Sequence, residues 1–218
     1  MAKKEKVKLN KFEKWFRSLH RFEKYVFRRI YWYKKCGHIQ TYDDRPYIFV
    51  GNHLSYADVF LMAVATNKPV HFIAKKQLFE KGLMKKFVTK CQCIPVSRDG
   101  TDVKAIMQAM KYLKGGESVA IFPEGTRNKT KEIFLPFKSG AAAISVKTKT
   151  PIVPIVQFKK LKPFRRRKVF YGEPIEFIDY YDKRLTEEDI KKCDEILLDK
   201  MLKMHAELAE MMKKGRKK

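Results

Sequence analysis

Residues 47–58, YIFVGNHLSYAD, contain the clearest fold signal in the chain. Residues 47–50 are apolar throughout and end at a glycine, which is typical of a strand buried on both faces of a sheet. The residues from 56 to 65 continue as an expected helix. The connection between the two elements contains His53 and Asp58. The segment therefore predicts a buried strand that passes almost directly into a helix.

The same alternation of strand and helix continues along the chain. Further strands are expected at 70–74, 93–96, 118–122, 152–158 and 169–171. Helices are expected at 77–90, 102–113, 140–147 and 187–212, the last with Thr186 as its N-cap. Because several of the strands are apolar throughout, we predict an α/β fold with a mostly parallel sheet flanked by helices.

Positive charge is concentrated in three segments. The chain has 49 Lys and Arg against 24 Asp and Glu, a net charge of +25. Residues 1–35 have a net charge of +10, residues 159–168 of +7 and residues 211–218 of +5. The rest of the chain is nearly neutral. We therefore divide the sequence into a basic helical arm, 1–35, and an α/β domain, 36–218.

The arm is also amphipathic. Its apolar residues recur every three or four positions: Phe12, Trp15, Phe16, Leu19, Phe22, Val26, Ile30 and Tyr33. Aromatic residues opposed to Lys and Arg are typical of a helix that lies in a lipid interface. The residues expected to dock on an anionic bilayer are Phe12, Trp15, Phe16, Arg17, Leu19, Arg21 and Phe22. The alternative is an ordinary helix packed on its own domain.

Composition also bears on location and on partners. No run approaches the ~20 apolar residues of a spanning helix, and no signal-peptide core follows the N-terminus. The four cysteines have no zinc-site spacing, so we expect reduced thiols and no metal. These features predict a peripheral, monotopic protein on the cytoplasmic face of the membrane. A nucleic-acid partner is disfavoured because the charge avoids the body and no zinc-finger or RNP-like run appears.

His53 and Asp58 are the candidate catalytic pair. They follow a buried strand, and ligands bind at the carboxyl ends of strands in open α/β sheets. A carboxylate that fixes the tautomer of a histidine makes that histidine a general base for an alcohol proton. No metal or covalent intermediate is needed if the electrophile is already activated.

A second group of residues is suited to a phosphate. Phe122-Pro123-Glu124-Gly125-Thr126-Arg127 follows the expected strand 118–122. Arginine is a bidentate phosphate ligand, and a glycine lets the backbone approach an anion. Three further cations follow strands or begin a helix: Lys75, Arg98 and Lys138. Together these groups predict a pocket for a phosphate that carries a hydroxyl nucleophile.

These motifs resemble those of a known family. NHLSYAD, the Arg of IPVSRDG, FPEGTR and VPIVQF are similar to the four ordered motifs of the glycerolipid acyltransferases, above all the 1-acylglycerol-3-phosphate acyltransferases. The resemblance covers about residues 47–158. It implies acyl transfer from acyl-coenzyme A or acyl-acyl carrier protein to the sn-2 hydroxyl of lysophosphatidate, and an arm that docks on the membrane.

The resemblance also implies roles for individual residues. His53 would be the general base and Asp58 its support, with no bound cofactor. The acceptor site would include Lys75, Arg98, Glu124, Gly125, Thr126, Arg127 and Lys138. The sequence departs from the family pattern at Gln77, where Glu is usual, and at Ser97, where an acidic residue commonly precedes the Arg. Open alternatives are a different acceptor, such as another lysophospholipid or glycerol 3-phosphate, and a catalytically silent lipid-binding relative.

Overall fold

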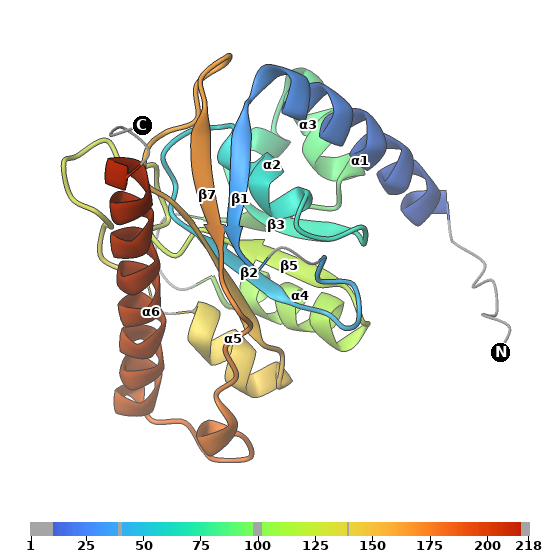
Figure 1. Cartoon of the computed structure of the whole chain (residues 1–218). Coiled ribbons are helices and arrows are strands. Elements are labelled where there is room, and N and C mark those ends of the chain that lie inside the picture. Colours follow the sequence, from blue (N-terminus) through green and yellow to red (C-terminus); the bar gives the residue numbers. More distant parts are fainter. Residues whose placement is uncertain (1–10, 39–40, 98–101, 139, 215–218) are drawn as a thin grey trace, which may run out of the picture.

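The computed structural model describes residues 11–38, 41–97, 102–138 and 140–214. Within these ranges, seven strands form one sheet in the order β1-β7-β6-β2-β5-β3-β4 (Figure 1). The strands are β1 Tyr33–Gly37, β2 Ile48–Gly51, β3 Val70–Lys75, β4 Ile94–Val96, β5 Ser118–Ile121, β6 Ile152–Gln157 and β7 Arg167–Tyr171. The run β6-β2-β5-β3-β4 is parallel, whereas β7 is antiparallel to β6 and parallel to β1. The predicted mostly parallel sheet is confirmed.

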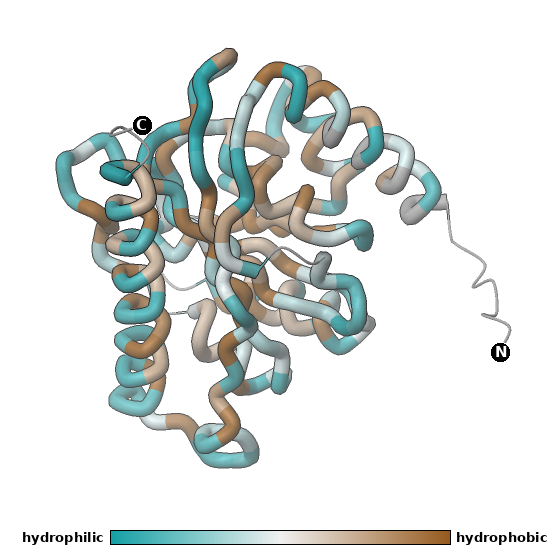
Figure 2. The backbone as a smooth tube through the Cα atoms, in the orientation of Figure 1, coloured by the Kyte–Doolittle hydropathy of each residue, from teal (hydrophilic) through white to brown (hydrophobic). Residues whose placement is uncertain are grey.

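Helices cover both faces of this sheet. They are α1 Lys11–Ile30, α2 Asp58–Ala63, α3 Gly82–Lys90, α4 Val103–Lys114, α5 Ala141–Thr148 and α6 Glu187–Lys214, with the 3-10 turns η1 Lys76–Phe79 and η2 Ile178–Tyr180. Helices α4, α5 and α6 share one core cluster with Ile48 and Val50, while α1 and α2 share the other with Phe49. Neighbouring side chains of β2 thus enter opposite cores, which explains why the strand is apolar throughout. Figure 2 shows hydrophobic residues concentrated in the segments at the centre of the molecule and hydrophilic ones in the outer loops.

The long closing helix is capped as expected. The hydroxyl of Thr186 accepts a hydrogen bond from the Asp189 backbone N–H at 3.1 Å, and Asp189 accepts one from the Thr186 backbone N–H at 3.0 Å. This reciprocal pair is a capping box with Asp as its acidic member. No helix in the described ranges is long and apolar enough to span a bilayer.

Two elements differ from the sequence prediction. β1 was not expected, and it begins two residues before the proposed boundary at residue 35, so that boundary falls inside a strand. The strand was missed because YKKCG lacks the apolar pattern of an interior strand; it pairs only with β7 at the sheet edge. The expected helix 77–90 is split into η1 and α3, because Gly82 adopts a φ of +72° where α3 begins.

The arm is packed on the domain through part of its apolar face. Phe16 is 6% exposed and Phe27 is 4% exposed, with the Phe27 ring 5.3 Å from that of Phe60 in α2. The prediction that Phe16 contacts the membrane is therefore corrected: its side chain faces the protein. Trp15 is half-buried beneath the Lys90 ammonium at 4.6 Å.

The remaining predicted docking residues fall into two groups. Arg21 is exposed, and Phe22 is 66% exposed. The side chains of Phe12, Arg17 and Leu19 lie outside the described residues. The alternative of a helix packed on its own domain thus describes the Phe16 and Phe27 positions, while Phe22 remains on the outer surface.

Candidate active site

The candidate site lies at the carboxyl ends of the central strands. His53 follows β2, and Glu124 follows its neighbour β5. On the other side of β2, the Asn52 side chain locks the end of β6: its amide donates to the Gln157 carbonyl and its oxygen accepts from the Gln157 N–H, both at 2.9 Å. The edge of three strands is thus fixed around His53.

Asp58 holds the His53 ring in one orientation. The His53 Nδ1 lies 3.1 Å from the Asp58 Oδ2, and the Asp58 side chain is only 1% exposed. The carboxylate also accepts hydrogen bonds from the backbone N–H of Leu54 and of Ser55, both at 2.6 Å, and from the Ser55 hydroxyl at 2.7 Å. An ionised carboxylate can only accept, so the proton lies on Nδ1 and Nε2 carries the lone pair.

The rest of His53 is equally constrained. Its ring stacks on Phe122 with centroids 4.1 Å apart and an angle of 19°. Its backbone N–H donates to the Glu124 Oε1 at 2.9 Å, and its carbonyl accepts from the Asn128 N–H at 2.7 Å. The side chain is 17% exposed, which leaves a limited approach for a substrate.

The Glu124 side chain points inward and connects two segments of the chain through hydrogen bonds to their backbones. It is 2% exposed, and its second oxygen accepts from the Leu135 N–H at 2.9 Å. Burial raises the pKa of this carboxyl, and the two backbone donors from Leu135 and His53 oppose that effect. Its carboxylate is thus occupied by backbone groups, and we assign it a positioning role for His53.

The other residues predicted for the acceptor site surround this edge. The Arg127 guanidinium stacks over the Tyr56 ring at 4.0 Å. Gly125 has a φ of +63°, and a Cβ added there would lie 3.1 Å from the Lys138 Cδ, so the lysine stem lies over the turn. Thr126 is exposed.

The structure gives less detail for the other two predicted cations. Lys75 is the last residue of β3, the strand next to β5. Arg98 lies outside the described residues.

Sequence reasoning missed the residues that hold the pair in place. Phe122 and Tyr56 lie inside the quoted motifs, but nothing in the sequence shows that one ring supports His53 and the other supports Arg127. The Asn128 N–H binds the His53 carbonyl, and the Gln157 backbone binds the Asn52 side chain. Their partners in the 52–53 segment are more than 70 positions away, so no local spacing could indicate them.

A carboxylate partner does not by itself distinguish His53. The His71 Nε2 lies 3.0 Å from Glu117, and the His38 Nδ1 lies 2.9 Å from Glu173. Asp43 follows His38 at the same spacing as Asp58 follows His53, but the observed partners of His38 and His71 both come from distant segments. However, His71 lies near the start of β3, and His38 follows the end of β1, which runs opposite to β2. Both therefore lie toward the other edge of the sheet.

An α/β sheet with a histidine–aspartate pair at its carboxyl edge is typical of enzymes that bind their substrates at this edge. Comparison with known proteins identifies the family. The family model described as "Acyltransferase" matches residues 34–157. The chain belongs to this acyltransferase family.

Individual relatives agree with the family assignment. A "1-acyl-sn-glycerol-3-phosphate acyltransferase" of Bacillus subtilis is 32% identical over 63% of this chain and 70% of its own length. A protein of the same name from Streptococcus pneumoniae is 31% identical over 68% of this chain and 56% of its own length. The crystal structure of the 1-acyl-sn-glycerophosphate acyltransferase PlsC from Thermotoga maritima superimposes with a TM-score of 0.66 and 25% identity, covering 92% of this chain and 81% of that one.

Proposed function

We propose that the protein transfers a fatty acyl group from an acyl thioester to the sn-2 hydroxyl of 1-acylglycerol 3-phosphate, which gives phosphatidate. The observation that carries this proposal is the His53–Asp58 contact of 3.1 Å at the carboxyl end of β2. The names of the relatives supply the acceptor, and the residues of this chain supply the chemistry.

His53 acts as the general base. Its Nε2 lone pair accepts the hydroxyl proton while the alcohol oxygen attacks the thioester carbonyl. The tetrahedral intermediate then collapses, the carbon–sulfur bond breaks, and the imidazolium returns its proton to the thiolate. Asp58 stabilises the imidazolium formed between these steps, because its buried negative charge lies beside Nδ1.

The cations bind the acceptor phosphate. Arg127 and Lys138 lie around the turn after β5, close in sequence to the Glu124 brace that holds His53. A phosphate held there would leave the neighbouring glycerol hydroxyl near the base. We propose the same role for Lys75, the last residue of β3, and for Arg98, which follows β4 in the sequence.

The donor is acyl-coenzyme A or acyl-acyl carrier protein, since both present the same thioester to the base. The enzyme would act as a peripheral protein on the cytoplasmic face of the membrane, where phospholipid biosynthesis supplies its lipid acceptor. The exposed Phe22 and Arg21 of α1 support contact with an anionic bilayer. Another lysophospholipid or glycerol 3-phosphate is the second candidate acceptor, because the departures at Gln77 and Ser97 bear on the choice of acceptor more than on the type of reaction.

An acyl-transfer assay tests the proposal. The purified protein is given lysophosphatidate with each donor, and then glycerol 3-phosphate and an uncharged lysolipid as competing acceptors. His53→Ala should lower kcat by ~10²–10⁴, the range for a lost general base. His38→Ala is the matched control, because His38 also pairs with a carboxylate but at the other edge of the sheet. Near-normal turnover by His53→Ala would refute the mechanism, and exclusive use of another acceptor would refute the assigned substrate.

A further inference from the structure

Described parts of the three basic segments, the end of α1, the β6–β7 connection and the last turns of α6, contact one another at one corner of the fold. The β6–β7 loop, residues 158–166, joins the end of α1: the Phe164 N–H donates to the Ile30 carbonyl at 2.7 Å, and the Arg167 N–H donates to the Trp32 carbonyl at 2.8 Å. The Lys168 ammonium donates to the Met211 carbonyl at 2.7 Å in the last turns of α6. Segments from the two ends of the described chain thus form one surface.

Two aromatic rings project from this corner. Trp32 is 49% exposed and Phe164 is 63% exposed, and the rings meet edge to face at 6.3 Å. Phe164 has a φ of +54°, a left-handed conformation that is unfavourable for a bulky side chain. The loop is anchored to the core by Leu161, which is 3% exposed and packs in the same cluster as Phe27. The fold therefore holds an aromatic ring outward in a strained conformation, and Figure 2 shows a hydrophobic tip above the hydrophilic start of β7.

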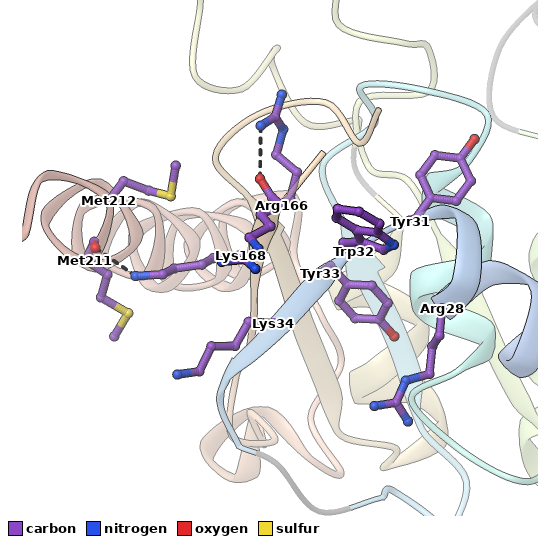
Figure 3. Close-up of a pocket in the computed structure, with 10 residues that line it drawn as sticks. Arg28, Tyr31, Trp32, Tyr33, Lys34, Arg166, Lys168, Met211 and Met212 are labelled. Carbon is purple, nitrogen blue, oxygen red and sulfur yellow. Dashed lines mark hydrogen bonds between the residues drawn. The ribbon is translucent and has the colours of Figure 1, made fainter. Parts of the chain in front are cut away.

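A basic cavity opens beside these rings. It has a volume of about 620 Å³, within the range of small-molecule sites. Five of its lining residues are cationic: Arg28, Lys34, Arg166, Arg167 and Lys168. No Asp or Glu is among the described residues that line it. Figure 3 shows the aromatic side chains on one side of the cavity and the two methionines of α6 on the other, with lysines between them.

The cavity and His53 lie toward the same edge of the sheet. β6 is parallel to β2, so Gln157 and Gly51 end at one edge. β7 is antiparallel to β6, and β1 is parallel to β7, so Arg167 and Tyr33 begin at that same edge. A flat surface that contacts the basic corner would therefore also face the carboxyl edge that carries His53.

We propose that this basic corner, formed by Trp32, Phe164, Arg166 and the cavity, binds the phosphate headgroups of an anionic bilayer. The cations attract the phosphates, and the two exposed rings occupy the headgroup boundary, where amphipathic aromatic side chains are favoured. An acidic protein partner would need the cations but would not require exposed aromatic rings at the loop tip. The inference extends the proposed function, because docking here presents the His53 edge to lipid.

Vesicle cosedimentation of the full-length protein tests this surface. The probes are vesicles of equal parts phosphatidylcholine and phosphatidylglycerol, and vesicles of phosphatidylcholine alone. Lys34→Gln combined with Arg166→Gln removes two charges from the cavity, and Lys111→Gln combined with Lys114→Gln removes two exposed charges from α4. Since each basic residue contributes roughly five-fold to binding on an anionic surface, the cavity variant should bind the anionic vesicles about 25-fold more weakly, and the α4 variant should bind nearly as wild type.

A second pair tests the aromatic contribution. Phe164→Asn removes the ring, and Asn tolerates the positive φ. Ile178→Asn is the control, because Ile178 is 66% exposed in η2, beyond the carboxyl end of β7. Phe164→Asn should weaken vesicle binding several-fold, while Ile178→Asn should not. A melting curve for each variant verifies that the fold is retained.

Two outcomes would overturn the proposal. The first is equal vesicle binding by the cavity variant and the α4 variant, which would mean that only net charge matters. The second is unchanged vesicle binding with turnover lost only when acyl carrier protein is the donor, which would assign the corner to an acidic protein. Vesicle binding requires no acyl transfer, so failure of the proposed enzymatic function would leave this measurement unaffected.

Discussion

The Asp58 Oδ2 lies 3.1 Å from the His53 Nδ1 and also accepts the backbone N–H groups of Leu54 and Ser55 at 2.6 Å. One buried oxygen therefore fixes both the ring of the base and the loop that carries it. The carboxylate could not turn away from the ring without leaving two backbone donors unpaired, which is costly in a buried position. The same carboxylate therefore fixes both the orientation of the imidazole and the conformation of its loop.

Asp58→Asn tests whether the negative charge of this side chain is needed, because it changes the charge and nearly keeps the shape. The amide is nearly isosteric, but it no longer stabilises the imidazolium or fixes the Nδ1–H tautomer. We expect kcat to fall by ~10²–10⁴ with lysophosphatidate as the acceptor. Asp44→Asn, at an exposed carboxylate bound to Tyr47, should leave kcat near the wild-type value. Equal, small effects of the two substitutions would contradict the role of Asp58.

Glu124→Gln tests the brace beneath His53. The two carboxylate oxygens accept from the N–H groups of His53 and Leu135, and an amide has only one oxygen to offer. The unpaired donor should lower the free energy of unfolding by about 1–3 kcal/mol. Because one of the two donors is the His53 backbone N–H, kcat should fall as well. Urea unfolding and steady-state kinetics measure the two effects; a stability loss with unchanged kcat would limit Glu124 to a structural role.

The sequence predicted this arrangement in outline because its signals are local. A buried strand, a histidine and an aspartate five positions later all lie within residues 47–58, and the turn at Glu124 directly follows another strand. The sequence did not reveal that Glu124 turns inward, since its partners Leu135 and His53 come from separate segments. It also did not reveal β1, an edge strand that exists because β7 lies beside it.

Arg127→Ala should mainly affect acceptors that carry a phosphate. The guanidinium stacks on Tyr56 at 4.0 Å, which holds its charge near the loop that carries His53. We expect a higher KM for lysophosphatidate and a much smaller change for an uncharged lysolipid. Tyr56→Leu keeps the Arg127 charge but removes the ring on which it stacks. It should therefore also raise the KM for lysophosphatidate selectively, by a smaller factor than Arg127→Ala. An equal loss on both acceptors would show that Arg127 does not bind the phosphate.

His71 should make stability depend on pH. Burial lowers the pKa of this imidazole, and nearby Glu117 only partly opposes the effect. As the pH falls below about 6.5, the unfolded chain therefore binds the proton more readily than the folded chain does. The free energy of unfolding decreases over this range until the pH is below the pKa of the folded imidazole. His71→Gln should unfold more easily at pH 8, because it removes the hydrogen bond of the single N–H of the neutral ring, to the Gln92 carbonyl or to Glu117, and the stacking of the ring on Tyr112. Its stability should nevertheless change less between pH 7 and pH 5 than that of the wild type, which urea titrations at each pH would measure.

The arm offers a pair of phenylalanines that separates packing from membrane contact. Phe16 is 6% exposed and Phe22 is 66% exposed, although both lie on one helix. Phe16→Ala should lower the free energy of unfolding by about 3 kcal/mol, the cost of a buried cavity. Phe22→Ala should change it by no more than about 0.5 kcal/mol, yet weaken binding to phosphatidylglycerol vesicles.

This pair is a better test of the arm than deletion of residues 1–35. That deletion would also remove buried Phe27 and the first residues of β1, so lost vesicle binding could reflect a damaged fold. If Phe22→Ala leaves vesicle binding unchanged while Phe16→Ala destabilises the protein, α1 is a packing helix. Membrane contact would then rest on the basic corner around Trp32 and Phe164. If Phe22→Ala weakens binding without loss of stability, the outer face of α1 and the basic corner act together, because the α1 carbonyl of Ile30 is bonded directly to Phe164.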